Sequence, residues 1–76
     1  MKAKDIAKDL KFNFRKELYE NDKIIEIEFN DGNGTRIVIS KEKIEYVEKH
    51  NRKELPTSLL KLVNKVIEEL GWLDER

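Results

Sequence analysis

The chain has 76 residues, of which 38% are hydrophobic and 42% are charged, and its 16 basic residues balance its 16 acidic ones. This length holds one small domain, so we expect residues 1–76 to form a single domain. The absence of cysteine and the presence of one histidine exclude disulfides, thiolate metal sites and most catalytic triads. We therefore expect no enzymatic activity, no cofactor, no bound metal and no small-molecule substrate.

The first ten residues predict a short amphipathic helix. Apolar residues recur there at helical spacing, at positions Ala3, Ile6, Ala7 and Leu10. The longest apolar run in this segment is two residues, so it predicts neither a signal peptide nor a membrane-spanning helix. We accordingly expect a cytoplasmic protein that does not contact a membrane.

Residues 11–19 fit two structures. Phe14 and Leu18 continue the face of the first helix, which would give one long helix ending near residue 19. The same segment also fits a strand that returns across a two-residue turn at Asn21-Asp22, and we favour this strand because the large apolar residues then share a face. The expected cross-strand pairs are Phe14 with Phe29, Lys16 with Ile27, Leu18 with Ile25 and, on the other face, Arg15 with Glu28.

The segment from Ile24 to Phe29 is the clearest strand, since apolar residues alternate there with glutamates. The run Asn30–Gly34 consists of residues that tolerate positive φ, which predicts a hairpin turn. Residues 35–40 then form the next strand. Pairing Phe29 with Ile37 keeps the apolar residues of both strands in phase.

The residues from Asp31 to Glu42 follow part of the spacing of a calcium-binding loop. Such a loop requires glycine at its sixth position, where this chain has Arg36, and it requires a helix on each side. We expect strands on both sides, so the segment predicts a hairpin turn without a calcium site.

A second helix is expected after Ser40, whose hydroxyl can cap a helix. The helix would carry Ile44, Tyr46 and Val47 and would end near His50, where a cation complements the helix dipole. A basic cluster in this segment could contact phosphates or stacked bases, although three interspersed glutamates weaken it. The cluster consists of Lys41, Lys43, Lys49, Arg52 and Lys53.

The last segment predicts the main core helix, with Pro56 in its first turn, Gly71 at its carboxyl-terminal cap and Trp72 folding back on the last turn. Seven large apolar residues between positions 59 and 70 make a face broader than one surface requires. Leu60 and Ile67 extend that face toward one edge. We interpret these two residues as a possible contact with a protein partner or a second copy of the chain.

Together these elements predict an α+β domain in the order α-β-β-β-α-α, an antiparallel three-stranded meander with helices on one face. The alternative is a long first helix, a two-stranded hairpin and two further helices.

The sequence favours a non-enzymatic protein-interaction module, a small regulator or adaptor that binds through the last helix or an exposed sheet edge. The alternative is a small nucleic-acid-associated factor that uses the basic cluster at residues 41–53. The near-zero net charge argues against a sequence-independent grip on nucleic acid. A composition rich in Lys, Glu, Ile and Asn favours a microbial source.

Overall fold

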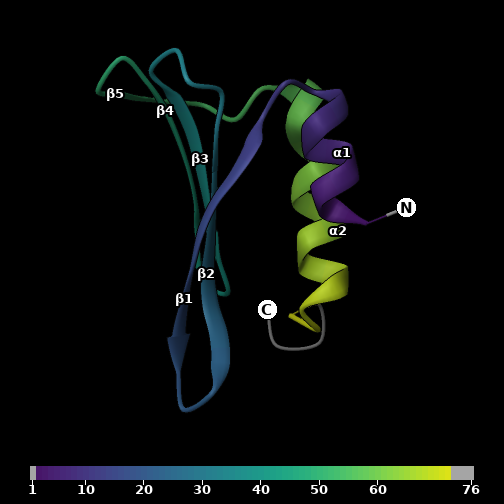
Figure 1. The fold of residues 1–76 in the computed structure, drawn as a ribbon. Helices are drawn as coiled ribbons and strands as arrows, with labels where there is room; N and C mark the ends of the chain where they lie inside the picture. The colour runs from purple at the N-terminus through teal and green to yellow at the C-terminus, as the bar shows by residue number, and fades with distance from the viewer. Residues whose placement is uncertain (1, 73–76) are drawn as a thin grey trace.

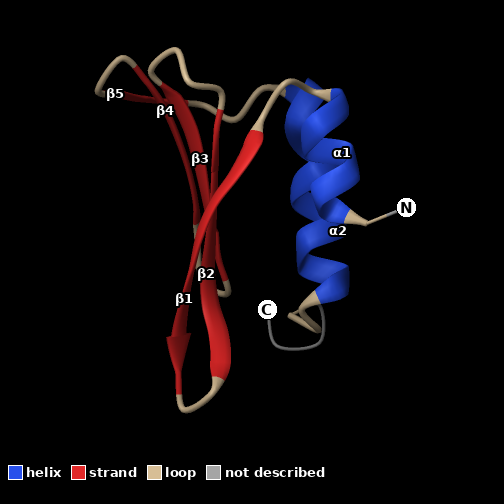
Figure 2. Cartoon of the chain, in the orientation of Figure 1, coloured by secondary structure: helices blue, strands red, loops and turns tan. Residues whose placement is uncertain are grey.

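The computed structural model describes residues 2–72, which form two layers (Figure 1). One layer is a five-stranded antiparallel sheet whose strands follow chain order, and both helices lie against one of its faces (Figure 2). The elements are α1 (Ala3–Asp9), β1 (Asn13–Glu20), β2 (Lys23–Asn30), β3 (Thr35–Ser40), β4 (Ile44–Glu48), β5 (Asn51–Lys53), a 3-10 helix (Thr57–Leu59) and α2 (Leu60–Glu69).

The expected three-stranded meander is wrong, because the segment after Ser40 forms β4 and β5 instead of a helix. The Ser40 hydroxyl does accept a hydrogen bond from the Lys43 N–H at 3.0 Å, as a helix cap would. However, the Ser40 N–H also donates to the Lys43 carbonyl at 2.9 Å, which closes a turn between two strands. A serine oxygen that accepts from the backbone a few residues ahead is common to helix caps and turns, so it does not distinguish them.

The turn between β4 and β5 has the backbone of a tight hairpin. Lys49 and His50 have φ angles of 48° and 71°, and Glu48 pairs with Asn51 on either side of them. The Lys49 N–H donates to the Gly34 carbonyl at 2.8 Å, which fixes this turn against the β2–β3 loop. The expected helix end at His50 is therefore wrong.

The strand interpretation of residues 11–19 is confirmed, and the alternative long helix is wrong. Asn21 and Asp22 form the two-residue turn, with φ angles of 52° and 66°. The pairs Phe14 with Phe29 and Phe29 with Ile37 are also confirmed.

The expected pairs further along β1 are wrong because the β1–β2 register shifts twice, between Phe14 and Lys16 and between Leu18 and Tyr19. Lys16 lies opposite Glu28, and Leu18 lies opposite Glu26. A shift of one residue moves a side chain to the other face of a sheet. Leu18 therefore lies on the outer face, away from the helices.

The core lies between the sheet and the helices. The carboxyl-terminal cap of α2 is as expected: Gly71 has a φ of 71°, and the Trp72 N–H donates to the Ile67 carbonyl at 3.0 Å. This cap brings the Trp72 ring into the core. The other main core residues are Ala3, Ile6 and Ala7 of α1, Ile27, Phe29, Ile37 and Ile39 of the sheet, and Leu62, Val63, Val66 and Ile67 of α2.

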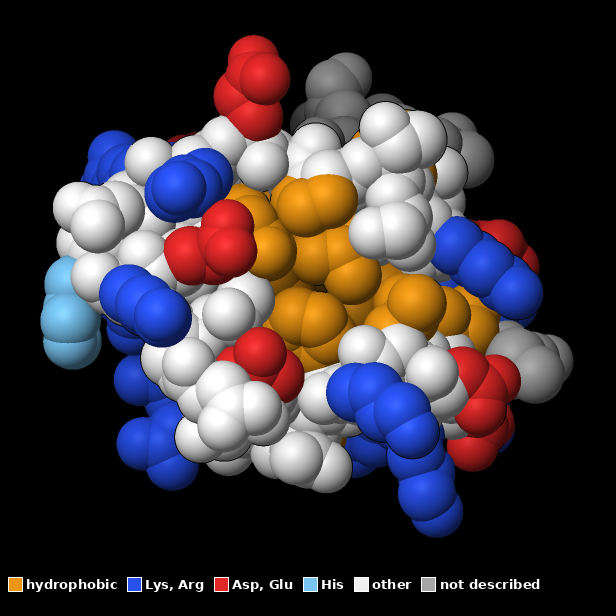
Figure 3. Space-filling model, turned by 90° about the horizontal axis from the view of Figure 1, so that it is seen from above, with side chains coloured by type: hydrophobic (Ala, Val, Ile, Leu, Met, Phe, Trp, Pro, Cys, Tyr) orange, Lys and Arg blue, Asp and Glu red, His pale blue; other side chains and the backbone are white. Residues whose placement is uncertain are grey.

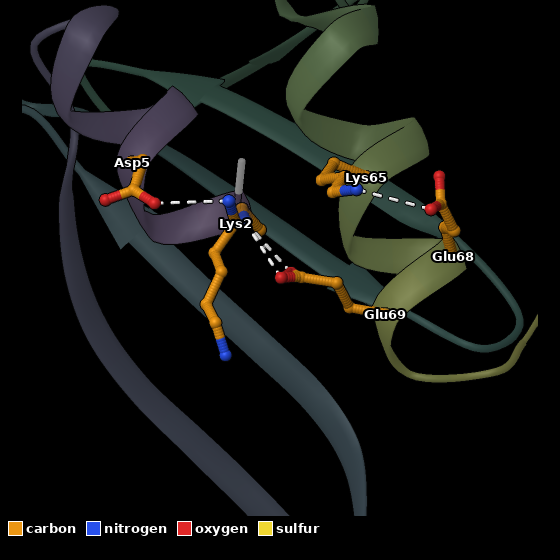
Figure 4. A network of polar contacts seen from close by, with 6 residues as sticks. Lys2, Asp5, Lys65, Glu68 and Glu69 are labelled. Carbon is orange, nitrogen blue, oxygen red and sulfur yellow. Dashed lines mark hydrogen bonds and ion pairs between the residues drawn. The ribbon is translucent and has the colours of Figure 1, made fainter.

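A carboxylate from α2 caps α1. Both oxygens of Glu69 accept hydrogen bonds from the Ala3 N–H, at 2.9 and 3.0 Å, and Asp5 accepts one from the Lys2 N–H at 3.1 Å (Figure 4). A helix of seven residues is too short to be stable alone, and its first N–H groups need acceptors from outside the helix. Glu69 thus fastens the start of the chain to its last helix.

The two leucines at the start of α2 provide a matched test of this packing. Leu62 is fully buried whereas Leu60 is exposed. We expect Leu62→Ala to lower the free energy of unfolding by about 2–5 kcal/mol, because it leaves a cavity in the core. Leu60→Ala should cost less than about 1 kcal/mol. Urea denaturation followed by circular dichroism measures both, and equal losses would contradict the packing.

Candidate interaction surface

Exposed hydrophobic side chains concentrate on the β1–β2 hairpin. Among residues 2–72, the exposed large hydrophobic side chains are those of Phe14, Leu18, Tyr19, Ile25 and Leu60. All but Leu60 lie on this hairpin. Leu18 and Tyr19 are 42% and 61% exposed, so the distal part of β1 presents apolar surface to solvent.

The turn end of the hairpin extends beyond the helices because its strands are longer than the helices. Eight residues of β1 or β2 extend about 26 Å, whereas the ten residues of α2 extend about 15 Å. The turn between β1 and β2 accordingly projects past the end of α2 (Figure 1). A depression of about 480 Å³ separates them, lined in part by Tyr19, Ile24, Leu70 and Trp72.

One side of β1 has no neighbouring strand, because β1 is the first strand in the sheet order. In a two-residue hairpin the flanking pair, here Glu20 and Lys23, exchanges hydrogen bonds. The backbone N–H and C=O groups of successive residues point alternately to the two sides of a strand. Leu18, two residues before Glu20, therefore also bonds toward β2, while Glu17 and Tyr19 direct their N–H and C=O groups outward. Such an edge can pair with a strand of another chain.

Charged side chains flank the exposed hydrophobic residues of β1. The Lys4 ammonium lies 4.3 Å from the centre of the Phe14 ring and covers part of it. The Tyr19 hydroxyl donates a hydrogen bond to Glu17 at 3.3 Å, and the negative charge of Glu17 raises the pKa of this phenol. Charges on an edge strand disfavour indiscriminate pairing with other strands.

The outer face of the sheet carries a buried carboxylate between two guanidinium groups. Glu28 is the buried charged residue of the described chain, with its side chain 8% exposed. Its carboxylate lies 3.7 Å from the Arg15 guanidinium and 3.9 Å from that of Arg36. These residues and His50 line a shallow depression of about 360 Å³. The expected cross-strand pair of Arg15 with Glu28 is nevertheless wrong, because Lys16 lies opposite Glu28 after the register shift.

The structure spreads the predicted basic cluster over the two turns that flank β4 and over β5. Lys41 and Lys43 lie in the β3–β4 turn, whereas Lys49 lies in the β4–β5 turn. The extended chain from Lys43 to Lys49 spans about 20 Å. Arg52 and Lys53 lie on β5. The five residues therefore do not share a helix face.

Glu45 neutralises part of the cluster. Its carboxylate lies 3.0 Å from the Lys43 ammonium and 3.2 Å from the Arg52 guanidinium. The hydrogen bond from Lys43, together with the positive charge of Arg52, lowers the pKa of Glu45. Two of the five cations are thus directed to a carboxylate of the chain itself.

The two predicted partner-binding residues of the last helix occupy different environments. Leu60 is 44% exposed, whereas Ile67 is 7% exposed and belongs to the core. Figure 3 views the end of the molecule where α1 ends and α2 begins, and there hydrophobic side chains reach the surface between the two layers. Leu60 can therefore contact a partner without rearrangement, but Ile67 cannot.

The turn that resembles a calcium loop is held by its own backbone. The Asp31 carboxylate accepts hydrogen bonds from the N–H groups of Asn33 at 2.7 Å and Thr35 at 3.1 Å, and the bond from Asn33 lowers its pKa. Within residues 2–72, no group of three or more His, Asp or Glu side chains is placed to hold a metal ion.

Comparisons with protein-family models, curated proteins and solved structures found no match to this chain. In the part of the chain that the structure describes, neither helix has the length and apolar character needed to cross a membrane.

The ion pairs of Glu45 give a pH-dependent prediction. Because its pKa is lowered by folding, the charged group stabilises the fold above about pH 4.5, and this contribution is lost as the pH falls through the lowered pKa. Glu45→Gln should therefore be less stable than the wild type at about pH 7, with a smaller difference at about pH 3. Urea denaturation at both pH values measures this, and a difference independent of pH would contradict it.

Proposed function

We propose that this chain is a non-enzymatic protein-interaction module that binds another polypeptide strand along the free edge of β1. The observation that carries the proposal is the coincidence of outward-directed backbone groups with the exposed side chains of Leu18 and Tyr19. In this mode of recognition the backbone supplies hydrogen bonds and alternate side chains supply specificity. The cytoplasm is the compartment that we propose for it.

The proposal favours the sheet edge over the last helix. A binding contact through Leu60 would rest on its side chain, because the Leu60 N–H already donates to the Thr57 carbonyl. The β1 edge offers both unpaired backbone groups and apolar area. A nucleic-acid function is favoured less, since the basic cluster is spread over two turns and β5 and is partly neutralised by Glu45.

Site-specific photo-crosslinking in the cells that make the protein tests this proposal. A photoreactive phenylalanine analogue at Tyr19 should give covalent adducts with a polypeptide. The same analogue at Leu60, which is also exposed but lies away from the edge, is the matched control and should give few adducts. Adducts at position 60 without adducts at position 19 would overturn the proposed edge and favour the last helix.

A further inference from the structure

We propose that the strand bound by β1 is β1 of a second copy of this chain, paired antiparallel about a two-fold axis at Leu18. This inference rests on the proposed function and adds the identity of the partner and the register. It would join the two sheets into one continuous sheet with the helices of both copies on the same face.

The backbone of β1 is compatible with this register. Glu17 and Tyr19 direct their N–H and C=O groups toward the free edge, as derived from the hairpin pair Glu20 and Lys23. With the axis at Leu18, Glu17 of one copy lies opposite Tyr19 of the other. The outward-directed residues of the two copies therefore meet each other, and each such pair exchanges two hydrogen bonds.

The side chains are self-complementary in the same register. Lys16, Leu18 and Glu20 pair with Glu28, Glu26 and Lys23 of β2, which places them on the outer face. Across the axis, Lys16 of each copy lies opposite Glu20 of the other, and the two Leu18 side chains lie opposite each other. Opposite charges and apolar pairs directly across antiparallel strands are stabilising.

The hydroxyl of Tyr19 and the carboxylate of Glu17 meet across the axis on the helix-facing side. They already form a hydrogen bond within one copy at 3.3 Å. In the proposed dimer each Tyr19 phenol also lies opposite the Glu17 carboxylate of the other copy. The phenol can then donate its hydrogen bond to either carboxylate. Both groups thus keep a partner in the dimer.

Neighbouring registers are worse. Residues directly opposite each other must lie on the same face, so the axis must pass through a residue of β1. An axis at Glu17 would place the two Glu17 carboxylates opposite each other, and an axis at Lys16 would do the same with two ammonium groups. An axis at Tyr19 would place Leu18 opposite Glu20 of the other copy. Lys16 would then have no residue of the other β1 opposite it. The net charge of zero adds no general repulsion between copies.

Charge reversal on the edge tests the register. In a dimer of the Lys16→Glu variant, two Glu-Glu contacts replace the two Lys-Glu contacts of the wild type. In a dimer of the Glu20→Lys variant, two Lys-Lys contacts replace them. Each variant alone should dimerise at least about tenfold more weakly than the wild type. An equimolar mixture of the two should regain wild-type affinity, because both contacts across the axis then join opposite charges. Lys61→Glu, the same charge change on the exposed side of α2, is the matched control and should leave dimerisation unchanged.

Analytical ultracentrifugation measures the association, and circular dichroism checks that each variant is folded. If a variant does not fold, a mixture of two differently isotope-labelled wild-type samples replaces it. Nuclear Overhauser contacts between the Leu18 methyl groups of two copies would then support the register. A wild type that stays monomeric up to about 1 mM, a mixture without recovery, or a dimer without Leu18 contacts would overturn the proposal.

These outcomes separate the inference from the proposed function. A monomeric wild type whose Tyr19 analogue crosslinks to a different polypeptide would overturn the second copy and leave the interaction module in place. The absence of both dimer and crosslinks at position 19 would overturn both.

Discussion

The structure depends on packing two short helices against long strands. Phe29, Ile37 and Ile39 on the sheet are covered by α2, which spans about 15 Å, while the β1–β2 hairpin spans about 26 Å. Helices of seven and ten residues cannot cover the whole inner face of such strands. The end of the hairpin therefore extends past the helices among residues 2–72.

This mismatch explains the exposure of Tyr19 on the inner face, whereas Leu18 is exposed because it lies on the outer face. Folding buries most of the broad apolar face of α2, including Ile67, and leaves Leu60 as its exposed member. The hairpin, in contrast, keeps Leu18 and Tyr19 in solvent beside an unpaired backbone. Its two register shifts turn Leu18 outward and leave Lys16 and Glu20 on the same face. The edge thus combines apolar area, backbone groups and a self-complementary charge pattern.

The sequence predicts those elements whose residue pattern is compatible with only one type of secondary structure. Apolar alternation gives β2 and β3, the Asn21-Asp22 turn fixes β1, and Gly71 ends α2. It does not predict β4 and β5, because Ser40 suits a helix cap and a turn equally. Lys49 and His50 also adopt positive φ without the glycine or asparagine that normally marks such a turn. The exposed sheet edge was expected as one possible contact, but the register shifts that define its faces leave no signature in the sequence.

Amide hydrogen exchange of the dilute monomer tests the central claim that the β1 edge is open. The account predicts alternation along the strand: the Leu18 amide, directed toward β2, should exchange slowly, whereas the amides of Glu17 and Tyr19, directed toward solvent, should exchange rapidly. Slow exchange at all three positions in a sample shown to be monomeric would contradict the account, because the edge would then be covered by the chain itself.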